Sequence, residues 1–163
     1  MLQPLRRRTW APRGQTPVQH AWDRHDRFSV LGALSLAPWA LRIGLYFRLF
    51  DHNITAADLV EFIKQLHRQL GRRLILVWDR WSVHRSAAKQ LAHYDWLQVE
   101  YLPAYAPELN PVEQVWNHTK YGDLANFVPT DAEHLRRSIV GALNHHQSDA
   151  RLKYSCFRHA KLA

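Results

Sequence analysis

Two acidic residues, Asp79 and Glu113, are the strongest candidates for chemistry in this chain. Asp79 follows the apolar run Leu74–Trp78, which has no polar alternation and therefore predicts a strand covered on both faces of a sheet. An acid directly after such a strand lies at its carboxyl end, where open α/β sheets place their sites. Glu113 follows Asn110 and Pro111, a favourable N-cap and first helical residue, so it should lie in the first turn of a helix. Two carboxylates on rigid elements could hold a divalent metal for phosphate chemistry.

Each acid also has a purely structural explanation. The sequence from Asn110 to Glu113 fits a capping box, in which Glu113 would accept a hydrogen bond from the Asn110 amide and do no chemistry. Asp79 could equally begin a turn or a helix. The spacing of the two acids therefore leaves both interpretations open.

Longer motifs around the acids favour the catalytic interpretation. Trp78 and Asp79 are followed by His84, and the string LPAYAPELNPVEQVW fills positions 102–116. Both motifs resemble the catalytic domain of DDE transposases, in the bacterial insertion-sequence branch of the mariner superfamily. The string RTWAPRGQTP at positions 8–17 resembles the same family, so the likeness covers nearly the whole chain.

This resemblance implies a ribonuclease H-like α/β fold, with a mixed sheet flanked by helices. It places the second and third metal-binding acids of the family at Asp79 and Glu113. Intact members would hold two Mg²⁺ or Mn²⁺ ions with three acids to cut DNA and transfer the strand. The first acid of the family lies just before the motif at 8–17, and positions 1–8 contain no acid. We therefore expect an N-terminally truncated domain without its first, central strand, and weak or absent cleavage by this chain.

Several residues near the acids are candidates for supporting roles. Asn110 would cap the helix of Glu113, and Asn117 and Lys120 would share a face with Glu113, where Lys120 could contact a DNA phosphate. His84 could orient an active-site group or bind a phosphate, or it could be a structural histidine near a helix start.

Arginines gather at the N-terminus, where Pro4, Pro12 and Gly14 predict a loop or arm over residues 1–16. These arginines could follow a DNA backbone, although a solvated basic loop explains them equally well. The residues concerned are Arg6, Arg7, Arg8 and Arg13.

Length and composition set the outer limits. A chain of 163 residues with 47% hydrophobic residues predicts one domain, with the arm at 1–16, a core at 17–150 and a tail at 151–163. A net charge of +8 favours a polyanionic partner such as DNA, and the family suggests transposon ends, target DNA, and a second copy or a full-length transposase. A single cysteine and the lack of a long apolar run predict a cytoplasmic protein, and the family resemblance implies a bacterial, nucleoid-associated one. The alternatives are a non-catalytic DNA-binding or regulatory fragment and a decayed gene product.

The predicted elements alternate between strands and helices, which is typical of α/β proteins. We expect a short strand at 17–21, then a hairpin with strands at 28–36 and 41–50, and a helix that begins after Thr55 and ends at Gly71. A strand at 74–78, a helix at 86–94, a short strand within 95–101, a helix from 111 to about 121 and a last helix capped at 130–131 should follow. Without the first strand, the sheet would have a gap between the hairpin and the strand before Asp79, with exposed hydrogen-bonding edges.

Overall fold

The strands of this protein form two separate ribbons. The computed structural model describes residues 5–15, 17–18, 27–37 and 42–160. Strands β1 (Ser29–Ala37) and β2 (Arg42–Phe50) pair antiparallel, whereas β3 (Leu74–Trp78) and β4 (Leu97–Tyr101) pair parallel. No strand among the described residues joins the two ribbons, so the expected gap between the hairpin and β3 is present. The predicted mixed α/β class is confirmed.

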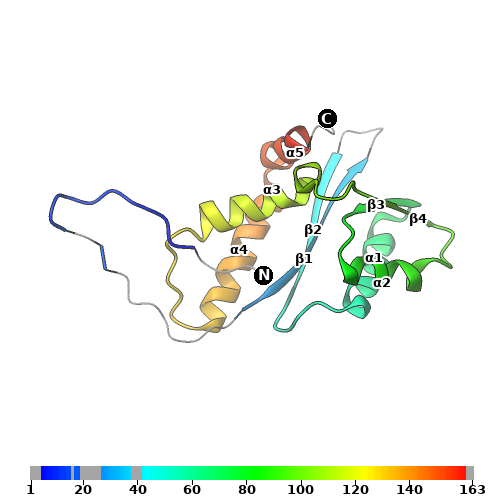
Figure 1. Cartoon of the computed structure of the whole chain (residues 1–163), viewed down its shortest axis with the longest axis horizontal. Helices are drawn as coiled ribbons and strands as arrows, with labels where there is room; N and C mark the ends of the chain where they lie inside the picture. Colours follow the sequence, from blue (N-terminus) through cyan, green and yellow to red (C-terminus); the bar gives the residue numbers. More distant parts are fainter. Residues whose placement is uncertain (1–4, 16, 19–26, 38–41, 161–163) are drawn as a thin grey trace.

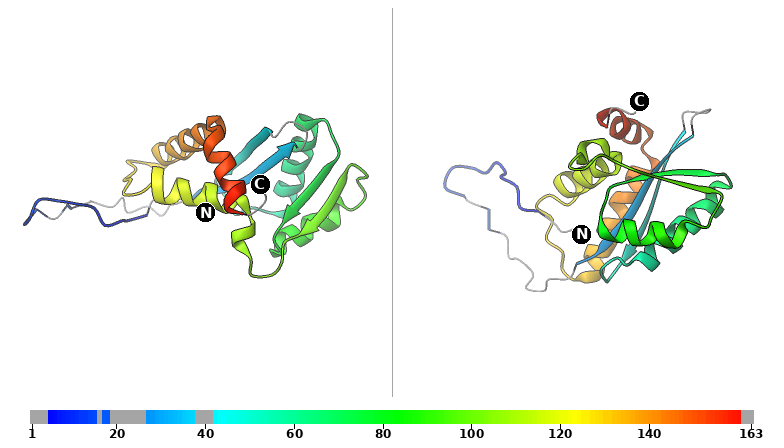
Figure 2. Two further views of the ribbon diagram at one scale, coloured as in Figure 1. Left: turned by 90° about the horizontal axis from the view of Figure 1, so that it is seen from above. Right: turned by 45° about the vertical axis from the view of Figure 1, so that its right-hand side comes forward.

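The hairpin lies in the middle of the molecule, between two groups of helices (Figures 1 and 2). Helices α3 (Pro111–His118), α4 (Ala132–Ser148) and α5 (Ala150–His159) lie on one side, and α1 (Ala56–Leu70) and α2 (Ser82–Leu91) lie with β3 and β4 on the other. The two faces of the hairpin accordingly belong to two cores. One core is built on Leu45, Val115, Ile139 and Leu143, and the other on Leu31, Phe62, Ile63 and Trp78.

Helix α1 shows how closely local signals fix an element. The Thr55 hydroxyl accepts a hydrogen bond from the Asp58 amide at 3.3 Å, and the Asp58 carboxylate accepts one from the Thr55 amide at 2.9 Å, which forms the predicted capping box. Gly71 ends the helix with φ 62°, and its amide donates to the His67 carbonyl. The helix therefore presents a continuous apolar face to β3 and the hairpin.

Strand β3 differs from the prediction because only one of its faces is covered by described residues. Ile75 and Val77 are 69% and 53% exposed, whereas Trp78 is buried. The apolar run predicted two covered faces, but α1 and α2 pack on one side only, and β3 has a single strand neighbour.

The helices also differ from the prediction, and α2 (Ser82–Leu91) both begins and ends earlier than the predicted range of 86–94. Helix α2 begins at Ser82, four positions before the predicted start. The prediction missed this start because the N-cap Trp81 makes no side-chain capping hydrogen bond and so leaves no signal in the sequence. Helix α3 ends at His118, where the π-helix η2 (Thr119–Asp123) replaces the predicted α-helical turn. The expected tail contains α5, which is capped by Asp149 and buries Cys156 and Phe157.

The described part of the N-terminal arm leaves the body of the molecule beyond α3 and α4 (Figure 1). Leu5 forms an isolated bridge with Ala125. The Arg7 amide donates to the Asn126 side chain at 2.7 Å, and the Arg7 guanidinium donates to the Tyr121 carbonyl at 2.6 Å. A further short strand predicted at 17–21 lies largely outside the described residues. Within the described ranges, no helix is long and apolar enough to cross a membrane.

Candidate active site

Asp79 lies directly after the carboxyl end of β3, and its side chain is held by the start of α2. One carboxylate oxygen, Oδ1, accepts a hydrogen bond from the Trp81 amide at 2.9 Å and lies 2.6 Å from His84 Nδ1. The His84 ring stacks on Trp78 with 4.7 Å between the ring centres, so its orientation is fixed by the core. No described residue hydrogen-bonds to the other oxygen, Oδ2, which leaves that oxygen available to a ligand.

Glu113 lies in the first turn of α3 but does not cap it. Asn110 is the N-cap, and its side chain accepts from the Val112 amide at 3.3 Å. The Asn110 amide donates to the Pro107 carbonyl at 3.0 Å and is therefore not bound by Glu113. The capping-box explanation of Glu113 is thus wrong, and its carboxylate makes no hydrogen bond within the part of the chain that the structure describes.

The electrostatics of Glu113 link the two acids. Burial raises the pKa of the Glu113 carboxyl, the positive charge of Lys120 opposes this rise, and the negative charge of Asp79 adds to it. An acid that responds to the charge of another must lie near it. The fold therefore brings together two carboxylates that are 34 positions apart in the sequence (113 minus 79).

Helix α3 is seated on β1 through a contact that the sequence analysis did not single out. A Cβ atom at Gly32 would lie 2.5 and 2.7 Å from two atoms of the Trp116 ring, and 3.3 Å from a Val112 methyl group. Only glycine allows the ring to lie this close to the strand, so Trp116 belongs to the core and positions the helix that carries Glu113. The available signal was an isolated glycine within a strand pattern.

The remaining predicted residues fall into two groups. Three of them lie around the acids. His84 contacts Asp79, Asn110 caps α3, and the charge of Lys120 acts on Glu113. Asn117 is exposed and hydrogen-bonds to neither acid. The arm that carries these arginines lies on the opposite side of the molecule from β3 and β4 (Figure 1), and Arg7 has the structural contacts described above.

The described residues do not complete a two-metal site. Carboxylate oxygens suit Mg²⁺ and Mn²⁺, but no group of three or more His, Cys, Asp or Glu side chains gathers in a metal-binding arrangement in the described ranges. Asp23 and Asp26, the acids of the segment before β1, lie outside these ranges. Asp79 and Glu113 alone are too few ligands for two ions.

The chain thus has a mixed α/β fold, with one acid after a strand end and another in the first turn of a helix. The fold is similar to that in the crystal structure of the Mos1 strand transfer complex, with a TM-score of 0.63 and 19% sequence identity. The similarity covers 99% of this chain and 48% of the Mos1 chain, so the chain spans about half of that solved relative. The ribonuclease H-like fold implied by the sequence is thereby confirmed.

The family is shown by a sequence model. The model of the DDE superfamily endonucleases matches residues 1–136, and the chain belongs to that family. The match contains both acids and every element from β1 to α3. Helix α5 lies outside it.

Two curated proteins also match this chain at low identity. Both are called methionine import ATP-binding protein MetN, from two strains of Xanthomonas oryzae pv. oryzae, and each is 26% identical over 121 residues. The alignment covers 74% of this chain and 33% of each relative. This chain contains no Gly-x-x-x-x-Gly-Lys-Ser/Thr motif, the phosphate-binding loop expected of an ATP-binding protein.

Proposed function

We propose that this chain binds DNA and supplies two of the acids, Asp79 and Glu113, to a transposase active site for DNA cleavage and strand transfer. The observation that carries the proposal is the acid pair itself. Neither carboxylate is neutralised by a lysine or arginine contact among the described residues, and Glu113 is half-buried without a hydrogen bond. Two such carboxylates at one place favour a cationic ligand. In the phosphate chemistry expected of the family, that cation would be Mg²⁺ or Mn²⁺.

The side chains around the pair support this role by holding the acids in place. His84 and the Trp81 amide fix Asp79 Oδ1, so that Oδ2 can face a ligand. Trp116 against Gly32 fixes the helix of Glu113. A complete centre would require a further carboxylate or DNA phosphate oxygens, and we therefore expect weak metal binding and little or no strand cleavage by this chain alone.

A non-catalytic DNA-binding or regulatory role is the second candidate. The net charge of +8 favours DNA binding whether or not the acids act, and the described residues gather no third metal-binding side chain with the two acids, which favours binding without cleavage. The inner edges of β1 and β3 have no strand partner among the described residues, which is compatible with a second copy or a full-length transposase as partner. A DNA partner would place the protein at the bacterial nucleoid.

The test measures metal binding, DNA binding and nicking on the same preparations. The variants are Asp79→Ala and Glu113→Ala, with Glu133→Ala on the surface of α4 as the control acid. We expect weak Mn²⁺ binding by calorimetry that both site variants lose and the control keeps, with little relaxation of supercoiled plasmid by any of them.

The outcomes separate the two candidates. Salt-dependent DNA binding without any Mn²⁺ binding at the acids would support the regulatory role and refute the catalytic one. Strong metal-dependent nicking that Asp79→Ala abolishes would contradict the expected impairment. A wild-type chain without affinity for DNA would refute both candidates.

A further inference from the structure

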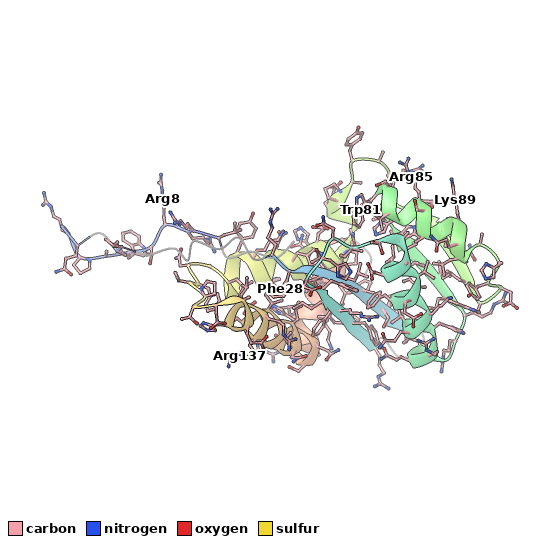
Figure 3. The ribbon with its side chains drawn as sticks, turned by 90° about the horizontal axis from the view of Figure 1, so that it is seen from below. Arg8, Phe28, Trp81, Arg85, Lys89 and Arg137 are labelled. Atoms are coloured by element: carbon pink, nitrogen blue, oxygen red, sulfur yellow. The ribbon has the colours of Figure 1, made fainter. Side chains whose placement is uncertain are left out.

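The exposed face of α2 is basic and begins beside Asp79. From Arg80 to Tyr94 the sequence contains no acidic residue, and the residues between them include Arg85 and Lys89. These two cations are four positions apart and therefore lie on one side of the helix, separated by about one turn of ~5.4 Å. Figure 3 shows both side chains pointing from α2 into solvent on the same side of the molecule.

The charges of Arg85 and Lys89 are not used within the described fold. Neither side chain makes a hydrogen bond or an ion pair with a described residue, and both are exposed. Other cations of the chain are occupied: Arg68 pairs with Glu61 at 2.8 Å, and Arg136 pairs with Glu133 at 2.9 Å. Two uncompensated cations on one helix face favour an anionic partner.

An exposed aromatic side chain connects this face to the acid. Trp81 is 45% exposed, although tryptophan has much apolar surface to bury. Its amide donates to Asp79, and its ring meets the His84 ring edge-on with 5.3 Å between the ring centres. From the end of β3 into α2, the chain therefore carries an acid, an exposed indole and two cations without a described partner.

We propose that this face, defined by Trp81, Arg85 and Lys89, guides a DNA strand toward Asp79. Arg85 and Lys89 bind phosphates of the strand, and Trp81 stacks on an unpaired base at its end. The inference rests on the proposed function, because it assigns the route by which that function's substrate reaches the acids. Cations alone would suit a duplex backbone, but the exposed indole next to the acid favours a strand with an unpaired end.

The test is fluorescence anisotropy on the full chain, with a labelled DNA duplex that is either blunt or carries a single-stranded overhang. The variants are Arg85→Ala, Lys89→Ala and their combination, with Trp81→Ala and the aromatic Trp81→Phe. Arg72→Ala is the matched control, because it removes the same charge from an exposed residue before β3, whereas Asp79 follows the other end of that strand.

We expect each α2 cation variant to lower the slope of log affinity against log salt by about 0.9, and the control to leave it unchanged. Trp81→Ala should weaken overhang binding roughly 5- to 100-fold while changing blunt-duplex binding little, and Trp81→Phe should restore most of the loss. Thermal melts verify that each variant is folded.

Three results would overturn the inference. A double cation variant with the same salt slope as Arg72→Ala would show that the face carries no DNA, with the proposed function still standing. If Trp81→Ala lowers the affinity for blunt and for overhang DNA equally, the assignment of Trp81 to an unpaired end would be removed. If the variants lose as much affinity for single-stranded RNA of the same sequence as they lose for the DNA, the assignment to DNA would be removed. A wild-type chain that binds no DNA would instead refute the proposed function.

Discussion

Replacing Gly32 by alanine should weaken the packing of α3, the helix that carries Glu113, against β1. The new Cβ would lie 2.5 and 2.7 Å from two carbons of the Trp116 indole, well inside normal contact distance. Trp116 packs against the core that contains Val115, so moving the ring away from β1 would disturb that packing. The substitution is therefore an overpacking change at a rigid contact.

The expected cost follows from that geometry. Overpacking by one methyl group typically costs about 1–3 kcal/mol, and two contacts below 3 Å place Gly32→Ala in the upper half of this range. For a domain of this size each kcal/mol lowers Tm by roughly 2–4 °C, so about 2–3 kcal/mol corresponds to a fall of roughly 4–12 °C. Gly141→Ala is the control, because nothing lies within 4 Å of a Cβ there. In the interior of α4 this control should raise stability by about 0.5–1 kcal/mol.

The assay is thermal and urea unfolding followed by circular dichroism, and it includes a double variant. The two clashing atoms belong to the six-membered ring of the indole, which Trp116→Phe removes from that position. The combination Gly32→Ala with Trp116→Phe should therefore be more stable than the sum of the two single changes predicts, by about 1 kcal/mol or more. A Gly32→Ala protein with the wild-type Tm, or strictly additive single changes, would refute the proposed contact between β1 and α3.

Three further changes test other parts of the structure. Because burial raises the pKa of Glu113, the folded state binds more protons than the unfolded state above the ordinary value of 4.5, and its stability falls as pH rises through the raised pKa. Glu113→Gln should therefore raise Tm at pH 7 and give no gain at pH 4; an equal gain at both values would contradict the assigned cause. Asp123→Ala should cost about 1–3 kcal/mol in urea unfolding, because it removes the 2.8 Å contact of His146, which is only 3% exposed and whose Nδ1 has no described partner. Lysine at Ile75 or Val77 should change the free energy of unfolding by less than about 0.5 kcal/mol and reduce light scattering in concentrated solution, whereas a large loss of stability would show that this face is covered.

Elements with local signals were predictable from the sequence. The hairpin, α1 and β4 were found where expected, because β-branched and apolar runs, the capping box at Thr55 and the glycine at Gly71 act within a few residues. The positions of Asp79 after a strand and of Glu113 in the first turn of a helix were also predicted correctly, since a strand end and a helix start are both visible in the sequence.

Features that depend on distant contacts were not predictable. The uncovered face of β3 depends on which elements pack against it, and the start of α2 has no capping side chain to mark it. In the π-helix after His118 the buried Thr119 hydroxyl donates to the Val115 carbonyl at 2.9 Å, and Leu124 is buried next to it in sequence, an environment set by tertiary packing. The contact between Gly32 and Trp116 joins residues 84 positions apart (116 minus 32), and a single sequence cannot indicate it.

The acids at the helix starts of this chain provide an internal standard for Glu113. The N-cap carboxylates of Asp131 and Asp149 accept hydrogen bonds from first-turn amides, and the carboxylate of Asp58, in the first turn of α1, accepts hydrogen bonds from the N-cap Thr55. These bonds lower the pKa of all three carboxyls. Glu113 lies in the same kind of position but accepts no described hydrogen bond, and burial raises its pKa. A carboxylate whose role was to stabilise the helix would resemble the other three. Burial disfavours the charged form of Glu113, Lys120 opposes this effect, and the charge of Asp79 adds to it. A cation bound near the two acids would offset both effects, as the proposed function requires.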